Sequence, residues 1–332
     1  MTDYFLGVDT GATKSHALIA DATGRALGFG EAGPGNHEVV GYAGMAEVLL
    51  GITRQAMAEA GISAGQISGA GFGLAGYDWP SERTATLDAI RPLGLSAPLE
   101  VVNDAAIAVP AGAAEGWGVA VVAGTSCNCW GWDRQRRHVG HMTGFSGLMG
   151  EMAGSGEFVL KSLHAVSREW SRRGPATRLS GAFVEAMGAR DVDDLIEGLT
   201  QGRYDLDADM APLAFRVAAE GDAVAQEVVR WAGQGLADLA IGVIHQVGIE
   251  ALAFDVVLAG SFFNGSPALA EVMRETIQAV APGARLVRLT APPVAGAVLL
   301  GMEMGGLDAC SRREKLIASV SGQAGKWGLA YV

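Results

Sequence analysis

The first 115 residues alternate between short apolar runs and segments of helical period. The runs 4–9 (YFLGVD) and 14–21 (KSHALIAD), followed by ALGFGEAG, predict three consecutive strands. Residues 42–60 repeat apolar side chains at helical spacing and end at Gly61, which favours helix termination. Two further strand–helix pairs complete this stretch. The order β-β-β-α-β-α-β-α predicts a mixed sheet flanked by helices.

The same plan begins again at residue 118. Residues 118–132 (GVAVVAGTSCNCWGW) predict a strand, a Gly-Thr-Ser turn and a second strand, which echo the opening FLGVDTGATKSHA. Residues 156–250 are mostly of helical period, and then come a strand (FDVVLAGSFF), a helix, a last strand (ARLVRLT) and a closing helix. The remaining residues are polar and show no clear pattern. We therefore expect an α/β protein with an N-terminal half, a C-terminal half that carries a helical insertion, and a tail packed on both, over residues 1–117, 118–302 and 303–332.

Composition and charge narrow the possible functions. The chain has 332 residues, of which 49% are hydrophobic, and this suits about two well-filled domains. The net charge of −12 opposes a nucleic-acid or anionic membrane surface, because both require clustered Lys and Arg. Three cysteines do not make a disulfide framework, and the start MTDYF lacks the features of a signal peptide. We expect a cytoplasmic protein that acts on small molecules.

Two glycine turns carry the first candidate chemistry. DTGAT (9–13) and GTS (124–126) each join two predicted strands, and glycine lets their N–H groups and hydroxyls approach phosphate oxygens. No GxxxxGK[ST] is present, and the glycines of 69–73 open no helix, so neither a P-loop nor a dinucleotide-binding fold is predicted. Asp9 ends a buried strand. Its carboxylate either accepts hydrogen bonds from the N–H groups of the turn or lies beside Lys14 or a magnesium ion.

A second acid at a strand end repeats this question. Asp104, in VVNDAAIA, lies where a predicted strand meets a predicted helix, with no basic residue near it in the sequence. One interpretation is an ordinary helix N-cap. The other is a general base that faces a cleft. The residues alone leave both interpretations open.

These segments form an ordered set that can be compared with known families. The set is GVDTGATKS, GPGNH, VVNDAA, AGTSCNC, GLMGEMAGS and VVLAGSFFN. It resembles the actin-like ATPase superfamily, and within it the N-acetylglucosamine kinase-like members of the BadF/BadG/BcrA/BcrD ATPase family, over residues 4 to about 302. Each motif alone is weak, but together in this order they are specific. The resemblance implies two actin-like (ribonuclease H-like) lobes, each a mixed sheet flanked by helices, with a cleft between them.

The resemblance implies ATP and Mg²⁺ as cofactors. Asp9 would hold the magnesium ion, Thr10 and Thr13 would contact phosphate, and Thr125 would face the β and γ phosphates. Gly260 and Ser261 match the adenosine motif, in which glycine lets a strand and a helix flank the purine. The full set of nucleotide-binding residues implied in this way is Asp9, Thr10, Gly11, Thr13, Lys14, Gly124, Thr125, Ser126, Gly260 and Ser261.

The resemblance also implies a sugar acceptor. Asp104 matches the catalytic aspartate, which would accept the proton of a 6-hydroxyl as the γ-phosphate is transferred. The substrate-binding residues implied are Asn36, His37, Asp104, Asn128, Phe145 and Glu151. The expected protein is an ATP-dependent kinase of N-acetylglucosamine, a homodimer whose lobes close about hinges near Trp117–Gly118 and Ala295.

Departures from the family pattern leave the sugar open. The family loop commonly reads GWGHMMGDEGS, whereas this chain reads GFSGLMGEMAGS. Phe145 therefore replaces a tryptophan, Glu151 replaces an aspartate, and one extra residue precedes Gly154. Because this loop contacts the sugar in the family, glucosamine and N-acetylmuramic acid stay open as alternative acceptors.

Two cysteines support a rival within the same superfamily. A 2-hydroxyacyl-CoA dehydratase-activating ATPase shares an iron–sulfur cluster across a dimer, and Cys127 and Cys129 alternate on one strand and would face the same side. His138 and His141 lie about ten residues further on and could join them around zinc. The alternative is that both cysteines are buried apolar residues.

Overall fold

The first sheet is built from the strands predicted near the N-terminus. The computed structural model describes residues 3–328. The strands β1 (Tyr4–Thr10), β2 (Ser15–Asp21), β3 (Ala26–Ala32), β4 (Ile67–Leu74) and β5 (Leu99–Val102) lie in the order β3-β2-β1-β4-β5. β1 pairs antiparallel with β2 and parallel with β4, and β4 pairs parallel with β5. The helices between these strands are α1 (His37–Ala60), α2 (Arg83–Ile90) and α3 (Ala108–Gly112). The predicted order of elements is confirmed.

The second sheet has the same topology as the first. Its strands β6 (Gly118–Ala123), β7 (Cys127–Trp132), β8 (Val139–His141), β9 (Phe254–Ala259) and β10 (Ala284–Arg288) lie in the order β10-β9-β6-β7-β8. β6 pairs antiparallel with β7 and parallel with β9, as β1 does with β2 and β4. The sequence echo between the two hairpins therefore reflects a repeated sheet, and the predicted α/β fold of two mixed sheets flanked by helices is confirmed.

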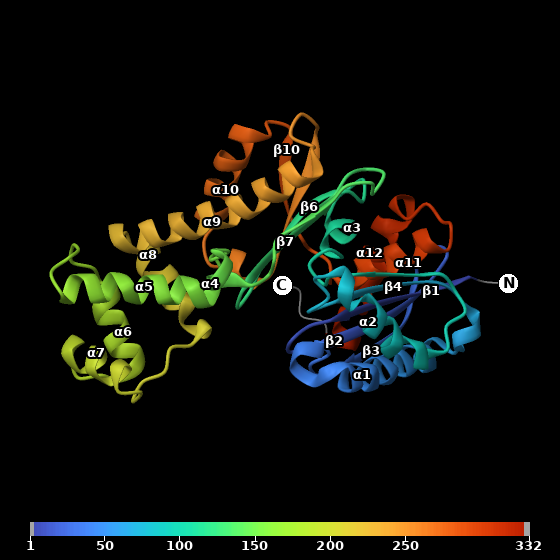
Figure 1. Cartoon of the computed structure of the whole chain (residues 1–332), viewed down its shortest axis with the longest axis horizontal. Helices are drawn as coiled ribbons and strands as arrows, with labels where there is room; N and C mark the ends of the chain where they lie inside the picture. The colour runs from blue at the N-terminus through green and yellow to red at the C-terminus, as the bar shows by residue number, and fades with distance from the viewer. Residues whose placement is uncertain (1–2, 329–332) are drawn as a thin grey trace.

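The helical insertion extends away from the second sheet (Figure 1). Its helices are α4 (Ser146–Met149), α5 (Ser155–Trp170), α6 (Leu179–Met187), α7 (Val192–Thr200), α8 (Ala211–Ala219) and α9 (Ala223–Val247), and α10 (Pro267–Val280) follows β9. α9 packs on β6, β7 and β8, so its buried face joins the insertion to the sheet. Among residues 3–328, no helix has the length and apolar character needed to cross a membrane.

The closing helix α11 (Val294–Met304) packs on the first sheet rather than the second. It lies against β1 and β4, where glycines allow a close approach. A Cβ at Gly7 would overlap the backbone nitrogen of Val298, and one at Gly71 would overlap the carbonyl oxygen of Ala297. This packing differs from a division at residue 302, which places the helix with the second sheet. The order of elements cannot show which sheet a helix covers, because that choice depends on long-range contacts.

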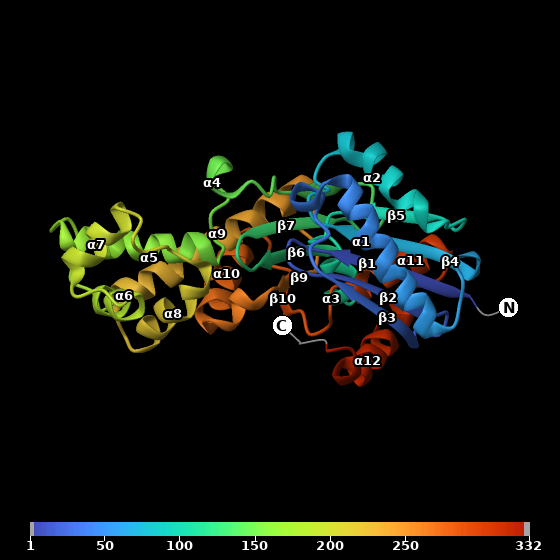
Figure 2. The same cartoon turned by 90° about the horizontal axis from the view of Figure 1, so that it is seen from below.

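A further helix occupies the tail that showed no clear pattern. α12 (Cys310–Trp327) buries Leu316, Val320 and Ala324, which are spaced four residues apart on one face. It packs beside β3 and α3 (Figure 2). The Trp327 ring stacks on Phe29 with 5.4 Å between centroids. Leu316 and Val320 belong to the same buried cluster as residues of α11. The tail is thus helical and belongs with the first sheet.

Candidate functional site

The predicted acids lie at the carboxyl ends of the parallel strands of the first sheet. Asp9 of β1 pairs in register with Gly73 of β4, and Gly73 pairs with Val102 of β5. Asp104 follows Val102 by two residues, so the fold brings it to the same edge as Asp9. Ligands bind at this edge of α/β sheets because loops leave it side by side.

Asp9 and Asp104 interact electrically. Burial, and after it the negative charge of Asp104, raises the pKa of Asp9 from 3.8 to about 8. Burial also raises the pKa of Asp104 from 3.8 to about 7, and the carboxylate of Asp78 adds to the effect. Two carboxyl groups with raised pKa values thus lie at the same edge of the sheet. Such groups suit the binding of a cation or the transfer of a proton.

Neither acid has the purely structural role that the sequence left open, which was a turn acid for Asp9 and a helix N-cap for Asp104. The Gly11 N–H donates to the Lys14 carbonyl at 2.8 Å, so this amide closes the turn without Asp9. The cap residue of α3 is Ile107, and Asp104 instead accepts from the Ala105 N–H at 2.9 Å. The interpretation of Asp104 as the N-cap of that helix is therefore wrong.

The first turn presents Thr13 and Lys14 to solvent. Both side chains are exposed, and Gly11 is partly exposed beside them. The carbonyl of Gly11 accepts from the Gly35 N–H at 3.0 Å, which ties the turn to the loop before α1. Thr10 is fully buried, and its hydroxyl is without a hydrogen-bond partner among the described residues. The turn is therefore anchored at its base and open at its tip.

The second turn is joined to the start of α5. Thr125 and Ser126 are exposed at its tip, and the Gly124 N–H donates to the Ser126 carbonyl at 2.9 Å. The N–H of Ser155 donates to the Gly124 carbonyl at 2.9 Å, so the first residue of α5 is held beside the turn. The Gly156 N–H likewise donates to the Thr125 carbonyl at 3.0 Å, so the turn and the first residues of α5 are held together.

Gly260 brings the end of β9 against the end of β6. Its φ of +100° lies in a region that favours glycine, and a Cβ would overlap the carbonyl oxygen of Ala123. Ser261 follows directly. Because Val122 pairs in register with Ala259, this exit lies beside the Gly124 turn.

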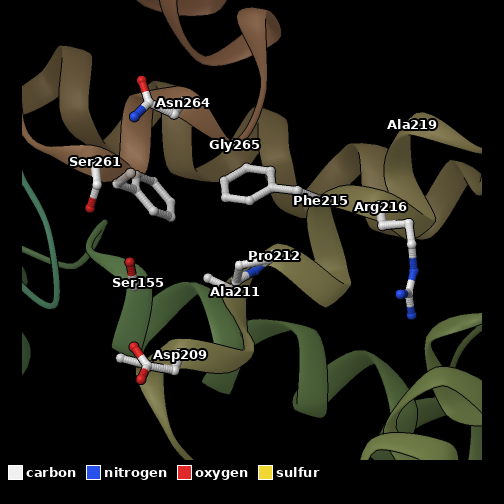
Figure 3. A pocket seen from close by; sticks show the side chains of 12 residues that line it. Ser155, Asp209, Ala211, Pro212, Phe215, Arg216, Ala219, Ser261, Asn264 and Gly265 are labelled. Carbon is white, nitrogen blue, oxygen red and sulfur yellow. The ribbon is translucent and has the colours of Figure 1, made fainter. Parts of the chain in front are cut away.

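A cavity of about 590 Å³ opens beside Ser261 (Figure 3). Ser155 and Ser261 lie at one end of it, and Arg216 extends at the other end. Phe215 lines the cavity and stacks on Phe158 with 4.3 Å between ring centroids. A flat apolar wall with polar groups at its rim suits a planar heterocycle joined to a polar chain. Sequence reasoning predicted Ser261 here and missed the lining residues between 208 and 219, which no motif marks.

The predicted sugar residues of the first half lie at the start of α1. Asn36 is its N-cap, and its side-chain oxygen accepts from the Glu38 N–H at 2.8 Å. The His37 ring stacks on Tyr42 with 4.4 Å between centroids and faces Glu82 at 3.9 Å. A Cβ at Gly76 would contact both Asn36 and His37, so these residues border the loop after β4.

The predicted sugar residues of the second half lie on β7 and the loop after β8. The Asn128 side-chain oxygen accepts from the Cys129 N–H at 2.7 Å, and its amide nitrogen borders Gly144. Phe145 is 63% exposed. Glu151 is buried, and its two oxygens accept from Thr143 and Gly144 of its own loop. Glu151 therefore binds its own loop, which differs from the direct sugar contact that the resemblance implied.

The site contains two polar residues that sequence reasoning did not select. Asp78 follows β4, and Asn103 follows β5 directly before Asp104. The Asn103 amide donates to Asp78 Oδ1 at 2.9 Å. The signal that could have found them is their position one loop beyond a strand of the same parallel set. The carboxyl ends of such strands meet at one edge.

Comparison with known proteins places the chain in a family. The sequence profile of the BadF/BadG/BcrA/BcrD ATPase family matches residues 6–301. The chain belongs to the BadF/BadG/BcrA/BcrD ATPase family. The resemblance found in the sequence is thereby confirmed, and it covers nearly the whole described chain.

Relatives within and around the BadF/BadG/BcrA/BcrD ATPase family match at low identity. An N-acetylmuramic acid/N-acetylglucosamine kinase from Clostridium acetobutylicum is 23% identical over 90% of this chain and 97% of its own length. An N-acetyl-D-glucosamine kinase from Dictyostelium discoideum is 25% identical over 90% and 98%. A solved structure from Chromobacterium violaceum, provisionally named an N-acetylglucosamine kinase, aligns with a TM-score of 0.65 and 21% identity over 90% and 98%. This structural likeness shows the shared fold.

The residues of this ATPase-family chain fit a nucleotide-borne magnesium ion. No group of three or more His, Cys, Asp or Glu side chains able to hold a metal occurs in residues 3–328. Magnesium, however, needs only one or two carboxylates when phosphates and water supply the other ligands. Burial and the charge of Asp104 make Asp9 costly to ionise, and a divalent cation beside Asp9 would offset that cost.

The two cysteines of β7 are unsuited to bind a cluster as they stand. Cys127 and Cys129 are buried, and burial raises the pKa of the Cys127 thiol to about 11 and that of Cys129 well above its ordinary value. Cluster ligands are thiolates, which this apolar setting disfavours. The His141 Nδ1–H donates to the Met142 carbonyl and the ring stacks on Trp130, and His138 pairs with Asp133. These contacts favour the interpretation of the cysteines as packed apolar residues.

Proposed function

We propose that this protein is an ATP-dependent kinase that transfers the γ-phosphate to the 6-hydroxyl of an amino sugar, with N-acetylglucosamine as the first candidate. One observation carries the proposal: Asp104 lies at the strand-end edge beside Asp9, with exposed glycine turns in both sheets. Family membership supports the use of ATP. The two relatives named as amino-sugar kinases support the class of acceptor.

The nucleotide would lie between the two glycine turns and the cavity beside Ser261. Its adenosine would occupy the cavity between Gly260-Ser261 and α8, with Phe215 against the base. Its phosphates would accept from the exposed hydroxyls of Thr13, Thr125 and Ser126 and from the Lys14 ammonium. Thr10, Gly11 and Gly124 would form the turns that carry these groups. When bound at Asp9, Mg²⁺ supplies positive charge that stabilises the phosphate oxygens.

Asp104 would act as the general base. In its ionised form it accepts the proton of the sugar hydroxyl while the oxygen of that hydroxyl attacks the γ-phosphorus. The bond between the γ-phosphorus and the β,γ-bridging oxygen breaks, and the electron pair leaves with ADP. A pKa near 7 suits this task, because a base is most effective when its pKa lies near the working pH.

The rest of the sugar would contact both halves of the molecule. Asn36 and His37 approach from the first sheet, and Asn128 and Phe145 approach from the second. We propose that the halves meet at Trp117–Gly118 and close over the bound sugar, which excludes water from the γ-phosphate. α11 and α12 would move with the first sheet, since they pack on it. The expected homodimer and cytoplasmic location stay predictions.

Glucosamine is a second candidate acceptor because the sugar side of the site is acidic. The charged groups with the largest effect on Asp78 include three acids, Glu82, Glu38 and Glu151, while His141 acts in the opposite direction. Such a field attracts an ammonium group and repels a carboxylate. It therefore favours glucosamine over N-acetylmuramic acid, whereas an uncharged N-acetyl group is indifferent to it.

A substrate panel tests the proposal. Purified protein with ATP and Mg²⁺ is assayed for ADP release and sugar phosphate on N-acetylglucosamine, glucosamine, N-acetylmuramic acid, N-acetylmannosamine and glucose. We expect turnover of an amino sugar, with N-acetylmuramic acid the poorest of the three main candidates. Absence of turnover on every amino sugar would refute the proposed function. Iron bound to anaerobically purified protein would favour the dehydratase-activating ATPase instead.

A further inference from the structure

Glu151 holds its own loop closed. Its Oε1 accepts from the Thr143 N–H at 2.8 Å, and its Oε2 accepts from the Thr143 hydroxyl at 3.0 Å and the Gly144 N–H at 2.9 Å. Its own N–H donates to the Ser146 carbonyl at 2.9 Å. With three donors on two oxygens and 8% of the residue exposed, this carboxylate has little capacity left for a ligand.

Asp78, in contrast to Glu151, keeps one carboxylate oxygen available for a ligand. It is only partly buried, and its Oδ1 accepts from the Asn103 amide at 2.9 Å. Among residues 3–328, no hydrogen bond reaches its second oxygen, Oδ2. Its backbone is fixed, because the N–H groups of Asp78 and Trp79 both donate to Glu82 at 2.8 Å. A rigid backbone with an unpaired carboxylate oxygen suits recognition of a ligand donor.

The loop closed by Glu151 lies against Asp78. A Cβ at Gly144 would lie 3.9 Å from Asp78 Oδ1 and 3.2 Å from the Asn128 amide nitrogen. Gly144 also has a φ of +71°, which favours glycine. The contacts of Glu151 with Thr143 and Gly144 thus fix the part of the loop that lies against Asp78. On its other side, Asn103 connects Asp78 to Asp104.

The surroundings of Asp78 make an unpaired charge costly. Burial, and after it the negative charges of Glu82 and Glu38, raises the pKa of Asp78 from 3.8 to about 6. Glu151 raises this pKa by a smaller amount, and His141 lowers it. Asp104 lies close enough for Asp78 to raise its pKa in turn. Hydroxyl donors stabilise an ionised carboxylate, so a sugar that donates to Asp78 would bind best above about pH 6.

Resting on the proposed sugar-kinase function, we propose that Asp78 is the carboxylate that accepts hydrogen bonds from ring hydroxyls of the acceptor sugar. Glu151 acts only as a positioning residue, through the loop 143–151 that it closes. The extra methylene of Glu151 relative to the aspartate of the family pattern lets it reach its own loop. Asp78, from the first sheet, then supplies the sugar contact.

The experiment compares Asp78→Asn and Glu151→Gln on matched sugars. Steady-state kinetics are measured with the hexosamine that the substrate panel selects and with its 3-deoxy and 4-deoxy analogues. Asp88→Asn is the control, because Asp88 is an exposed carboxylate of α2 that pairs with Arg91. We expect Asp78→Asn to raise the KM for the sugar about 10–100-fold, the loss typical of a charged hydrogen bond, with the KM for ATP within twofold.

The deoxy sugars separate binding from positioning. For the analogue that lacks the hydroxyl bound by Asp78, the loss caused by Asp78→Asn should shrink to less than about threefold, because the partner is already missing. Glu151→Gln should lower kcat/KM by the same factor on every analogue and keep the rise in the sugar KM below about pH 6. That rise should disappear in Asp78→Asn, whereas the fall in kcat below about pH 7, which we assign to Asp104, should stay.

Two outcomes would overturn the inference. One is an equal loss on all analogues for Asp78→Asn, which would mean that Asp78 acts only through Asp104. The other is a loss of kcat/KM in Glu151→Gln that becomes much smaller for one of the deoxy sugars than for the parent sugar. The wild-type protein gives an independent check, since its KM should rise below about pH 6 for the parent sugar and not for the matching analogue. If wild type turns over no amino sugar while the assay controls work, the proposed function fails and this inference falls with it.

Discussion

At the scale of single residues, the site is defined by carboxylates that the fold makes costly to ionise. Asp9, Asp78 and Asp104 lie at one edge of the first sheet, and each has a raised pKa with burial as the largest cause. Buried acids that are not paired with arginine or lysine reduce stability. Such a cost is typical of residues retained for function.

The proposed base leads to a prediction about turnover. Asp104→Asn should lower kcat about 10²–10⁴-fold, because the amide cannot accept the hydroxyl proton, and should leave nucleotide affinity within about threefold. In wild type, kcat should fall as the pH drops below about 7, where Asp104 becomes protonated. Initial rates over pH 5–9 and calorimetric titration with an ATP analogue measure both. Near-normal turnover in the variant would remove Asp104 as the base.

Asp9 leads to a prediction about stability and pH. Its pKa is about 8 in the folded state and 3.8 ordinarily, so between these values the folded protein holds a proton that the unfolded chain releases. The stabilisation of the folded state by the proton on Asp9 is complete below about pH 4 and is lost as the pH rises through 8. Asp9→Asn should therefore match wild type in Tm at pH 4 and exceed it by about 2–6 °C at pH 8–9. Thermal melts without nucleotide, with Asp88→Asn as control, measure the difference, and a pH-independent difference would contradict it.

At the scale of elements, two helices complete the first sheet after the chain has already built the second. α11 packs on β1 and β4, and α12 covers β3 beside it. The Lys326 ammonium of α12 pairs with Glu59 at the end of α1, and the Trp327 indole donates to the same carboxylate at 3.0 Å. The C-terminal helix is thus part of the folded core of the first half.

Removal of one core side chain tests the contribution of α12. Leu316 is fully buried and packs among residues of α11 and the first sheet. Leu316→Ala should lower the free energy of unfolding by about 2–4 kcal/mol, through lost burial and the cavity left behind. Lys315→Ala, at the exposed position beside it, should change it by less than about 0.5 kcal/mol. Chemical denaturation measures both, and equal effects would mean that α12 is not packed as described.

At the scale of the whole molecule, contacts cross between the two sheets on both sides of the site. Trp79, which follows β4, lies edge-on to His141 of β8 with 5.6 Å between ring centroids. On another side, Arg136 in the turn between β7 and β8 pairs with Glu303 of α11 at 2.5 Å. The Arg136 guanidinium also lies 4.7 Å above the Trp132 ring. The halves are therefore in contact through side chains as well as through the chain itself.

Closure of the halves should be visible in the emission of one tryptophan. Trp79 is 48% exposed, so a closing cleft would change its surroundings. Addition of the preferred sugar should shift or quench the fluorescence of wild type, and Trp79→Phe should remove most of that change. Trp170→Phe is the matched control, because Trp170 is 49% exposed at the end of α5, within the helical insertion. A sugar-dependent change that survives in Trp79→Phe would argue against closure at this contact.

Local signals in the sequence were enough to predict most helices and strands and the family of this protein. Apolar period, glycine turns and helix stops are local signals, so the two repeated β-rich halves and the turns at 9–13 and 124–126 could be read directly. The faint period of α12 was missed because only Leu316, Val320 and Ala324 carry it among polar residues. Tertiary structure alone decided that α11 covers the first sheet, that α8 lines the cavity beside Ser261, and that Glu151 turns to its own loop while Asp78 stays unpaired. Each of these depends on contacts between residues far apart in the chain, and pattern along a sequence does not encode which distant partner a side chain will meet.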